Sequence, residues 1–125
     1  MTGQALFADL LVIDCASFIA GPAAGTILAD FGARVIKIEP PDGDGYRKIK
    51  HLPGVPRCDS NYPWRLTNRN KESLALDLKQ PEARVVLERL VSRADVFITN
   101  YPLPVRDKLR LQYTDIRALN PTLIY

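Results

Sequence analysis

The first 39 residues encode a strand-helix-strand unit, which constrains the fold more than any other stretch of the chain. Residues 10–13 form an apolar run that is too short to span a membrane and is typical of a buried strand. Gly21-Pro22 begins a helix, because proline at the first helical position loses no hydrogen bond. Residues 35–38 form a second apolar run that ends at Glu39, immediately before two prolines. Such a unit predicts a parallel sheet with helices packed on its faces.

The helix of this unit carries a pattern of its own. Ala24, Ile27, Leu28 and Phe31 recur at spacings of three and four, so one face of the helix is apolar. Gly32 follows, and a glycine at this place supplies the left-handed residue at which helices commonly end.

The rest of the chain continues the alternation of strand and helix. Residues 73–78 alternate apolar and polar side chains, which predicts a strand, and Pro81 starts a helix with an apolar stripe. Shorter elements are predicted after it, namely a strand at residues 95–99, a helical turn at 105–109, a helix at 113–119 and the start of a strand at 122–125. This order indicates an α/β fold with a Rossmann-like, doubly wound and mainly parallel sheet.

Proline and glycine are concentrated in the middle of the chain, and we expect a long loop over about residues 40–67. Residues 46–71 also carry seven Lys and Arg against Asp59 alone, a net charge of +6, so the rest of the chain carries −3 of the total of +3. This segment suits an anionic partner; the alternative is a solvated loop paired with acids elsewhere. We expect no nucleic acid partner, because the aromatic residues here sit among prolines rather than in a stacking repeat.

Composition places the chain among ordinary globular proteins, since 46% of its 125 residues are hydrophobic and 25% are charged. Its start has no basic residue ahead of the apolar run, and no apolar stretch approaches the roughly 20 residues of a spanning helix. We therefore expect a cytoplasmic protein with no membrane segment. Cys15 and Cys58 are too few for a disulfide scaffold and form no metal-binding pattern with His51, so we expect no metal and two reduced thiols.

The turn before the first helix raises a dinucleotide-binding interpretation. The turn is rich in glycine, and Glu39 ends the second strand at a place where an acid can hold a ribose. However, the turn reads A-G-P-A-A-G rather than G-x-G-x-x-G, so the second glycine, which lets the backbone reach a pyrophosphate, is missing. Nicotinamide or flavin binding is therefore the weaker interpretation.

Four blocks of the sequence resemble a single family. They are AGPAAGTILADFGARVIKIE (residues 20–39), NRNKESLALDLK (68–79), ADVFITNY (94–101) and LNPTLIY (119–125). In this order and spacing they are similar to the N-terminal part of the class III coenzyme A transferases, the CaiB/BaiF family, which also includes α-methylacyl-CoA racemases. The resemblance covers nearly the whole chain, so residues 1–125 are interpreted as the N-terminal portion of such a domain. We expect a longer natural chain, because the final LIY resembles a strand entering a core.

The resemblance implies an enzyme that moves coenzyme A from an acyl-CoA to a free carboxylic acid. In that family an aspartate attacks the thioester and passes through mixed-anhydride and aspartyl-CoA intermediates. The matching position lies beyond Tyr125, so the resemblance assigns no catalytic residue in this chain, and Asp14, Asp30 and Asp77 are interpreted as cap or turn residues. Family members form interlocked homodimers, which implies that this portion packs against the rest of its own fold and a partner.

The resemblance also implies contacts with coenzyme A, at positions near or after the ends of predicted strands or in the helical turn near residue 108. These positions are Ile19, Ala20, Leu76, Lys79, Asn100, Tyr101 and Lys108. Ile19 and Ala20 match backbone positions near the thioester end of the ligand. Lys79 matches a position near the nucleotide end, and Lys108 matches a basic residue that meets a phosphate. Fixed cations and backbone donors suit the diphosphate and the 3′-phosphate of coenzyme A.

Two departures from the family pattern concern the nucleotide end. Many members carry Arg where this chain has Pro40, and a Phe-x-Pro-Gly turn where this chain has Tyr-Pro-Leu-Pro at residues 101–104. Arg47 and Arg69 are candidates to replace the missing cation. For Lys79 and Lys108 the alternative is a solvated surface charge, and for Arg69 and Lys71 it is a loop-to-acid ion pair. Trp64 is interpreted as an apolar anchor for the long loop.

Two functional alternatives stay open. These residues do not separate transferase from racemase, because the proton-transferring residues of the racemases also lie downstream. A chain of this length could also be catalytically inert and serve only as a coenzyme A-binding or assembly module.

Overall fold

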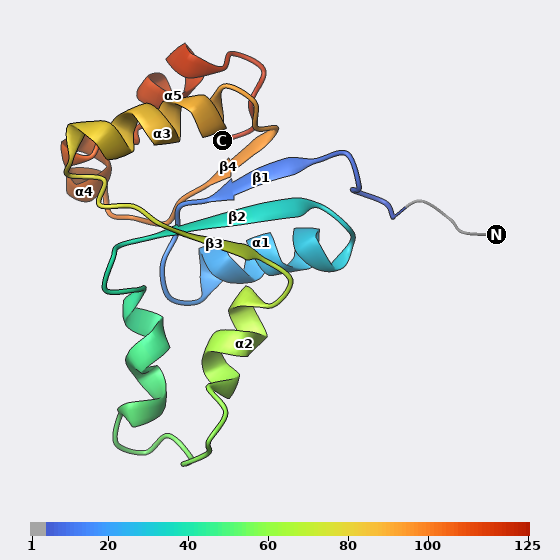
Figure 1. Ribbon diagram of the computed structural model, residues 1–125, viewed down its shortest axis with the longest axis vertical. Helices are drawn as coiled ribbons and strands as arrows, with labels where there is room; N and C mark the ends of the chain where they lie inside the picture. Colours follow the sequence, from blue (N-terminus) through green and yellow to red (C-terminus); the bar gives the residue numbers. More distant parts are fainter. Residues whose placement is uncertain (1–4) are drawn as a thin grey trace.

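Four parallel strands form the sheet on which the structure is built. The structure is a computed structural model that describes residues 5–125, so residues 1–4 of the predicted domain lie outside the described residues (Figure 1). The strands are β1 (Leu11–Asp14), β2 (Arg34–Glu39), β3 (Glu72–Ala75) and β4 (Val96–Ile98), paired in the order β3-β2-β1-β4. Every pairing is parallel, which confirms the predicted α/β fold with a mainly parallel sheet.

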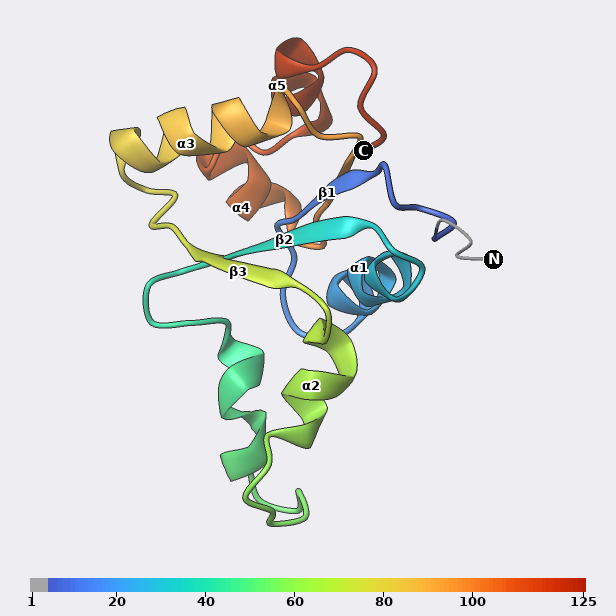
Figure 2. The same cartoon turned by 45° about the vertical axis from the view of Figure 1, so that its right-hand side comes forward.

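Helices cover both faces of this sheet. α1 (Ala20–Asp30) lies against one face, while α3 (Pro81–Val91), α4 (Leu103–Lys108) and α5 (Tyr113–Leu119) lie on the other side (Figure 1 and Figure 2). The chain moves outward from β1 to β2 and β3 and then returns to the other side of β1 as β4. The strand order therefore reverses between β1 and β4. In open α/β sheets, ligands bind outside the carboxyl ends of the strands at such a point.

Two apolar clusters hold the layers together. The larger cluster lies between the sheet and the helices that follow β3, and its buried members include Ile13, Ile36, Ile38, Leu87, Val91, Phe97, Leu111 and Ile116. The smaller cluster lies between the sheet and α1 and consists of Val12, Ala29, Ala33 and Val35. Successive residues of β1 and β2 belong to different clusters, because the side chains of a strand alternate between its two faces.

Most of the apolar face predicted for α1 does not face the sheet, and of its four residues only Leu28 packs against the smaller cluster. Ile27 and Phe31 are 56% and 51% exposed, whereas the buried residues of this helix are Pro22, Gly25, Thr26 and Ala29. Ala29 packs in the smaller apolar cluster, whereas Gly25 faces inward where the helix lies close to charged side chains. A Cβ added to Gly25 would lie 3.2 Å from Asp14 Oδ2 and 3.3 Å from Lys71 Nζ.

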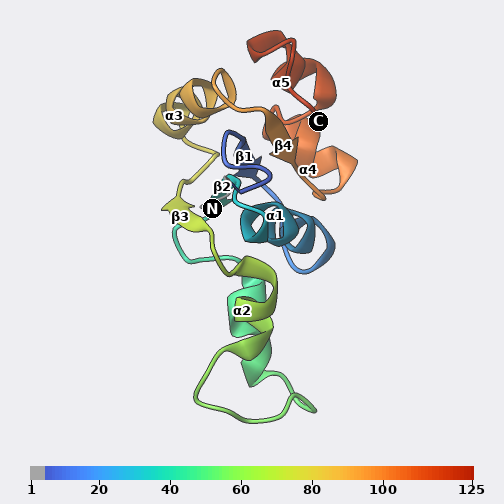
Figure 3. The same ribbon diagram turned by 90° about the vertical axis from the view of Figure 1, so that its right-hand side faces the viewer.

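The prediction of one long loop over about residues 40–67 is wrong. This stretch contains a 3₁₀-helix, η1 (Gly45–His51), and most of α2 (Tyr62–Asn68), which together project from the α1 side of the sheet (Figure 3). Asp44 caps η1 by accepting a hydrogen bond from Tyr46 N at 2.8 Å. Pro63 occupies the first turn of α2. The cap residue Asp44 and the helix-starting Pro63 were not recognised in the sequence, because many prolines and glycines surround them.

The remaining elements follow the sequence more closely. α3 begins at Pro81 and α5 spans Tyr113–Leu119, as predicted, and α4 replaces the expected helical turn. β3 starts one residue earlier than the predicted strand, and it also ends three residues earlier than predicted. The expected final strand is reduced to one bridge, in which Ile124 pairs with Val96. Within residues 5–125, no helix combines the length and the apolar character that a membrane crossing needs.

Gly32 tests how closely the segment before β1 packs on the end of α1. Its φ is +102°, as expected for a helix stop, and an added Cβ would lie 2.4 Å from the Ala5 Cβ. Gly54 has a similar φ of +83° but nothing within 4 Å of its added Cβ.

We expect Gly54→Ala to lower the free energy of unfolding by about 1 kcal/mol, which is the backbone cost alone. We expect Gly32→Ala to lower it by about 2–4 kcal/mol, because overpacking adds to that cost. Equal losses in urea denaturation would contradict this packing.

Candidate functional site

A buried ion pair joins β1 to the end of α2 at the carboxyl edge of the sheet. Lys71 Nζ lies 2.7 Å from Asp14 Oδ2, and the two side chains are 2% and 0% exposed. The same ammonium group donates to the carbonyls of Pro22, at 2.6 Å, and Thr67, at 2.8 Å. Burial lowers the pKa of Lys71, and the charge of Asp14 opposes that shift. The contacts of Lys71 thus tie β1, α1 and α2 together.

A second buried pair joins β2 to the loops around it. Lys37 Nζ lies 3.1 Å from Asp44 Oδ2, with both side chains at most 2% exposed, and it also donates to the Ala16 carbonyl. Asp44 Oδ1 accepts hydrogen bonds from Ser17 Oγ at 2.9 Å and from Tyr46 N at 2.8 Å. The loop after β1 and the start of η1 are therefore bound to the same carboxylate.

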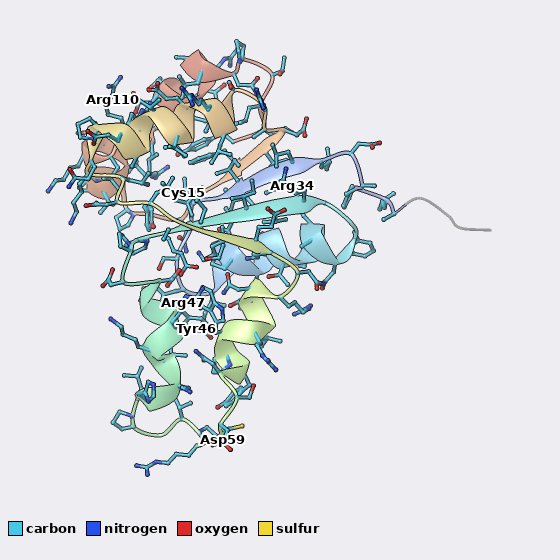
Figure 4. The ribbon with its side chains drawn as sticks, viewed as in Figure 1. Cys15, Arg34, Tyr46, Arg47, Asp59 and Arg110 are labelled. Carbon is cyan, nitrogen blue, oxygen red and sulfur yellow. The ribbon has the colours of Figure 1, made fainter. Side chains whose placement is uncertain are left out.

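Glu39, at the end of β2, is the third buried acid of this edge. Arg47 of η1 donates to both of its oxygens, at 2.7 and 2.6 Å, and Ser73 Oγ donates at 2.6 Å. The Arg47 guanidinium also lies 3.8 Å from the ring centroid of Trp64, between η1 and α2 (Figure 4). Burial alone would raise the pKa of Glu39, but the hydrogen bonds from Arg47, Ser73 and the Asp44 N–H lower it to about 2. The carboxylate considered above as a ribose ligand is thus already occupied by internal donors.

Asn100 closes the point at which the strand order reverses. Its side chain accepts from Ser17 N at 2.8 Å and donates to Ser17 O at 2.7 Å, so it holds the loop after β1 against the loop after β4. A Cβ added to Gly21 would lie 2.5 Å from Ala16 Cβ and 3.5 Å from Asn100 Cγ. Gly21 of the A-G-P-A-A-G turn is therefore required where the first turn of α1 packs against Ala16, while its distance to Asn100 is that of an ordinary contact.

The loop after β1 presents apolar side chains to solvent. Phe18 and Ile19 are each 55% exposed, and Ala20 is exposed as well. Phe18 has a φ of +62°, an uncommon conformation for a bulky residue, and its ring meets that of Tyr46 edge to face at 6.2 Å. Ile19 precedes the first turn of α1, which has no side-chain cap. Free backbone donors and apolar surface therefore meet at the mouth of this loop.

Two adjoining pockets lie beyond the ends of β2 and β3. The smaller, of about 120 Å³, is lined by Ile38, Glu39, Pro40, Leu76, Asp77, Leu78, Lys79, Tyr101 and Leu109. The larger, of about 400 Å³, is lined by Leu78, Lys79, Gln80, Pro81, Arg84, Lys108, Leu109 and Arg110. They share Leu78, Lys79 and Leu109, so one groove runs from a mainly apolar compartment to a cationic one.

The structure divides the seven predicted contact residues into two groups. The two pockets bring together Leu76, Lys79, Tyr101 and Lys108, with Lys79 in both. Ile19, Ala20 and Asn100 belong instead to the point where the strand order reverses. Burial raises the pKa of the Tyr101 hydroxyl, so this ring stays neutral even in alkaline solution.

The proposed replacements for the missing cation are engaged elsewhere. Arg47 is held by Glu39, and Arg69 pairs with Asp30, 2.5 Å away. With Lys71, and with Lys48, which lies 4.0 Å from Asp42, they account for four of the seven cations of residues 46–71, so the interpretation as a loop paired with acids holds for these four. Lys50, Arg57 and Arg65 form no ion pair within the part of the chain that the structure describes.

Sequence reasoning missed several residues of this edge. Lys37 had a signal, since a lysine inside the apolar run VIKIE calls for a buried partner. Arg84 and Arg110 had no such signal in the sequence, because packing of α3 against the turn after α4 brings them to the larger pocket.

Residues 5–125 contain no group of three His, Cys, Asp or Glu side chains placed to hold a metal ion. Burial, with the nearby Asp14 charge, raises the pKa of the Cys15 thiol to about 12.

Comparison with known proteins decides the family. Residues 7–125 match the family model described as CoA-transferase family III. The chain belongs to this family. The resemblance found in the four sequence blocks is therefore confirmed, while the assignment of individual contact residues stays a prediction.

Relatives within CoA-transferase family III act on different acids, to judge from their names. Succinate–glutarate CoA-transferase of Agrobacterium fabrum is 43% identical over 118 residues, which cover 91% of this chain and 30% of the relative. Acetyl-CoA:oxalate CoA-transferase of Acetobacter aceti is 41% identical over 120 residues, 95% of this chain and 30% of the relative. A CaiB/BaiF family protein from Brucella suis superimposes with a TM-score of 0.86 at 37% identity, covering 98% of this chain and 33% of that one. The chain thus spans about 30% of the length of the curated relatives it matches.

The Glu39–Arg47 pair predicts how stability depends on pH. The pKa of Glu39 is about 2 in the folded protein and 4.5 in the reference state, so its contribution is complete above about pH 4.5 and is lost as the pH falls toward 2. We expect the free energy of unfolding to fall over this window, and to fall less steeply in Arg47→Met. Arg34→Met, which breaks an exposed pair with Glu72, serves as the control. Urea denaturation between pH 2 and 6 measures all three proteins; an unchanged slope in Arg47→Met would contradict this account.

Proposed function

We propose that this chain holds the nucleotide end of coenzyme A in a transferase that moves coenzyme A from an acyl-CoA to a carboxylic acid. The observation that carries the proposal is the groove of two adjoining pockets, which collects four of the seven predicted contact residues. In the proposal, the smaller compartment, with Leu76 and Tyr101, receives the flat adenine ring. The larger compartment, with Lys79 and Lys108, receives phosphate.

The thioester end is proposed to lie at the point where the strand order reverses. Ile19 and Ala20 are exposed there, next to the uncapped first turn of α1. Asn100 supports this arrangement as a positioning residue, because its amide fixes the backbone of Ser17. Coenzyme A would then run along the carboxyl edge from β1 toward the start of α3.

The chemistry is proposed to use an aspartate from outside these 125 residues. Its carboxylate attacks the acyl thioester, releasing the coenzyme A thiolate and leaving a mixed anhydride; the thiolate then attacks the aspartyl carbonyl, releasing the first carboxylic acid and forming an aspartyl-CoA thioester. The acceptor carboxylate reverses the two steps. Asp14 and Asp44 do not suit this role, because each is fully enclosed and paired with a lysine.

Transfer is favoured over racemisation by the names of the relatives, since the curated relatives reported above are CoA-transferases. As parts of the same proposal, the protein acts in the cytoplasm and packs as a homodimer or against further segments of its fold. Exposed large apolar side chains on α1 and α2 support such packing; they include Ile27, Phe31 and Leu66, of which Leu66 is 67% exposed.

Coenzyme A binding tests the proposed site. We expect calorimetry to detect binding to the unmodified protein, and Lys79→Ala and Lys108→Ala each to weaken it by about 5- to 30-fold, because each removes a charge-assisted contact with phosphate. Lys50→Ala is the matched control, since Lys50 lies in η1, which projects from the sheet, and lines neither pocket of the groove. Absence of binding, or an equal loss in the Lys50 variant, would refute the site.

Assembly gives a separate test. We expect sedimentation of the 125-residue chain to reveal dimers or larger species, because exposed apolar surface of this kind associates in water. Replacing Ile27 and Phe31 by Ser should shift the distribution toward monomer. A monodisperse monomer of the unmodified chain would contradict the proposed packing.

A further inference from the structure

The larger pocket contains more positive charge than the proposed function has used. Four of its eight lining residues are Lys or Arg, and no Asp or Glu lines it. Lys79 and Lys108 were expected to meet coenzyme A from the family resemblance. Arg84 and Arg110 were not expected from any motif, so their roles follow from their contacts alone.

Arg84 uses its guanidinium inside the protein. Its Nε donates to Glu88 Oε1 at 2.8 Å, and its Nη1 donates to the Arg110 carbonyl at 2.7 Å. The Arg84 side chain is only 16% exposed, and Glu88 balances its charge. Arg84 is therefore a positioning residue that ties the backbone of Arg110 to α3.

Arg110 differs from Arg84 because only its backbone is engaged. Its carbonyl accepts from Arg84, and its N–H donates to the Asp107 carbonyl at 3.0 Å. Its guanidinium has no hydrogen bond or ion pair to any of residues 5–125, and it lines the pocket beside α3, where Figure 4 labels it. Its φ is +54°, a conformation in which glycine would be favoured. The turn is thus fixed at both backbone groups, while the five N–H donors of the guanidinium form no hydrogen bond or ion pair with residues 5–125, and Arg110 lines the pocket.

The charge and shape of the pocket select among the phosphates of coenzyme A. The diphosphate carries about one negative charge per phosphorus and is flanked by ester links, whereas the 3′-phosphate is a terminal monoester with about 1.5 to 2 charges and three accessible oxygens. Two ammonium groups and a planar guanidinium around one pocket match the monoester better. The groove also places this pocket on the side of the apolar compartment that lies toward α3, away from the loop after β1.

We propose that Arg110, together with Lys79 and Lys108, binds the 3′-phosphate of coenzyme A and makes this chain select coenzyme A over 3′-dephospho-coenzyme A. This inference rests on the proposed function and adds a specificity-determining residue to the same site. Arg110 supplies the bidentate guanidinium, and Arg84 holds it in place through the Arg110 carbonyl.

Calorimetry with coenzyme A and 3′-dephospho-coenzyme A, at one ionic strength, tests this role. We expect Arg110→Gly to weaken coenzyme A binding by about tenfold, the usual value of a charged contact, and to leave binding of the dephospho form unchanged. The affinity of Arg110→Lys for coenzyme A should fall between that of the unmodified protein and that of Arg110→Gly. Glycine suits the backbone at this position, so Arg110→Gly should keep or raise the melting temperature, and Arg65→Ala, an exposed arginine on α2, controls for loss of one positive charge.

The outcomes separate this inference from the proposed function. If the unmodified protein binds neither ligand, the proposed function and the role of Arg110 both fail. If it binds coenzyme A but Arg110→Gly weakens both ligands equally, or weakens neither, the proposed function stands and the role of Arg110 is overturned. A loss confined to coenzyme A, absent in Arg65→Ala, supports Arg110 as the 3′-phosphate ligand.

Discussion

Buried charge pairing at the carboxyl edge of the sheet is the interaction on which the rest of this structure depends. Lys37 and Lys71 lie against Asp44 and Asp14, and all four side chains are at most 2% exposed. A lone ammonium at such a depth is strongly disfavoured, and removing one partner of a buried pair commonly costs about 3–5 kcal/mol. The two pairs draw on β1, β2 and both ends of the projecting segment, so these parts can be stable only when they are assembled together.

One hydroxyl group connects these ion pairs to the candidate site. Asp44 accepts from Ser17 Oγ, and the backbone of Ser17 is held on both sides by the Asn100 amide. The loops after β1, β2 and β4 therefore form one hydrogen-bonded unit at the place where the strand order reverses. Phe18, which directly follows Ser17, is thus kept in a left-handed conformation although it is bulky, and Ala16, which directly precedes Ser17, is the residue that an added Cβ at Gly21 would meet.

The sequence predicts the sheet better than it predicts the surfaces around it. Apolar runs located the strands, and Pro22 and Pro81 located the first turns of α1 and α3, because both signals act through local backbone physics. The orientation of α1 was not predictable in this way, since Gly25 lies against Lys71 and Asp14, and Thr26 donates to the Thr67 carbonyl of α2, contacts that only the assembled fold provides. Leu76 and Lys79, which follow β3, were predicted from the family resemblance, whereas Arg110 was not, because packing rather than chain position brings it to the pocket.

The names of the relatives bear on the role that is proposed for this chain. Their names specify different acids, yet each also names coenzyme A. A segment that contacts the shared ligand can keep its fold among such enzymes, and the Brucella suis structure retains it with a TM-score of 0.86 at 37% identity. On the proposed function, the groove of this chain meets the nucleotide that every substrate carries. Discrimination among acids then requires contacts at the thioester end, where Phe18 and Ile19 leave apolar surface exposed next to the loop held by Asn100.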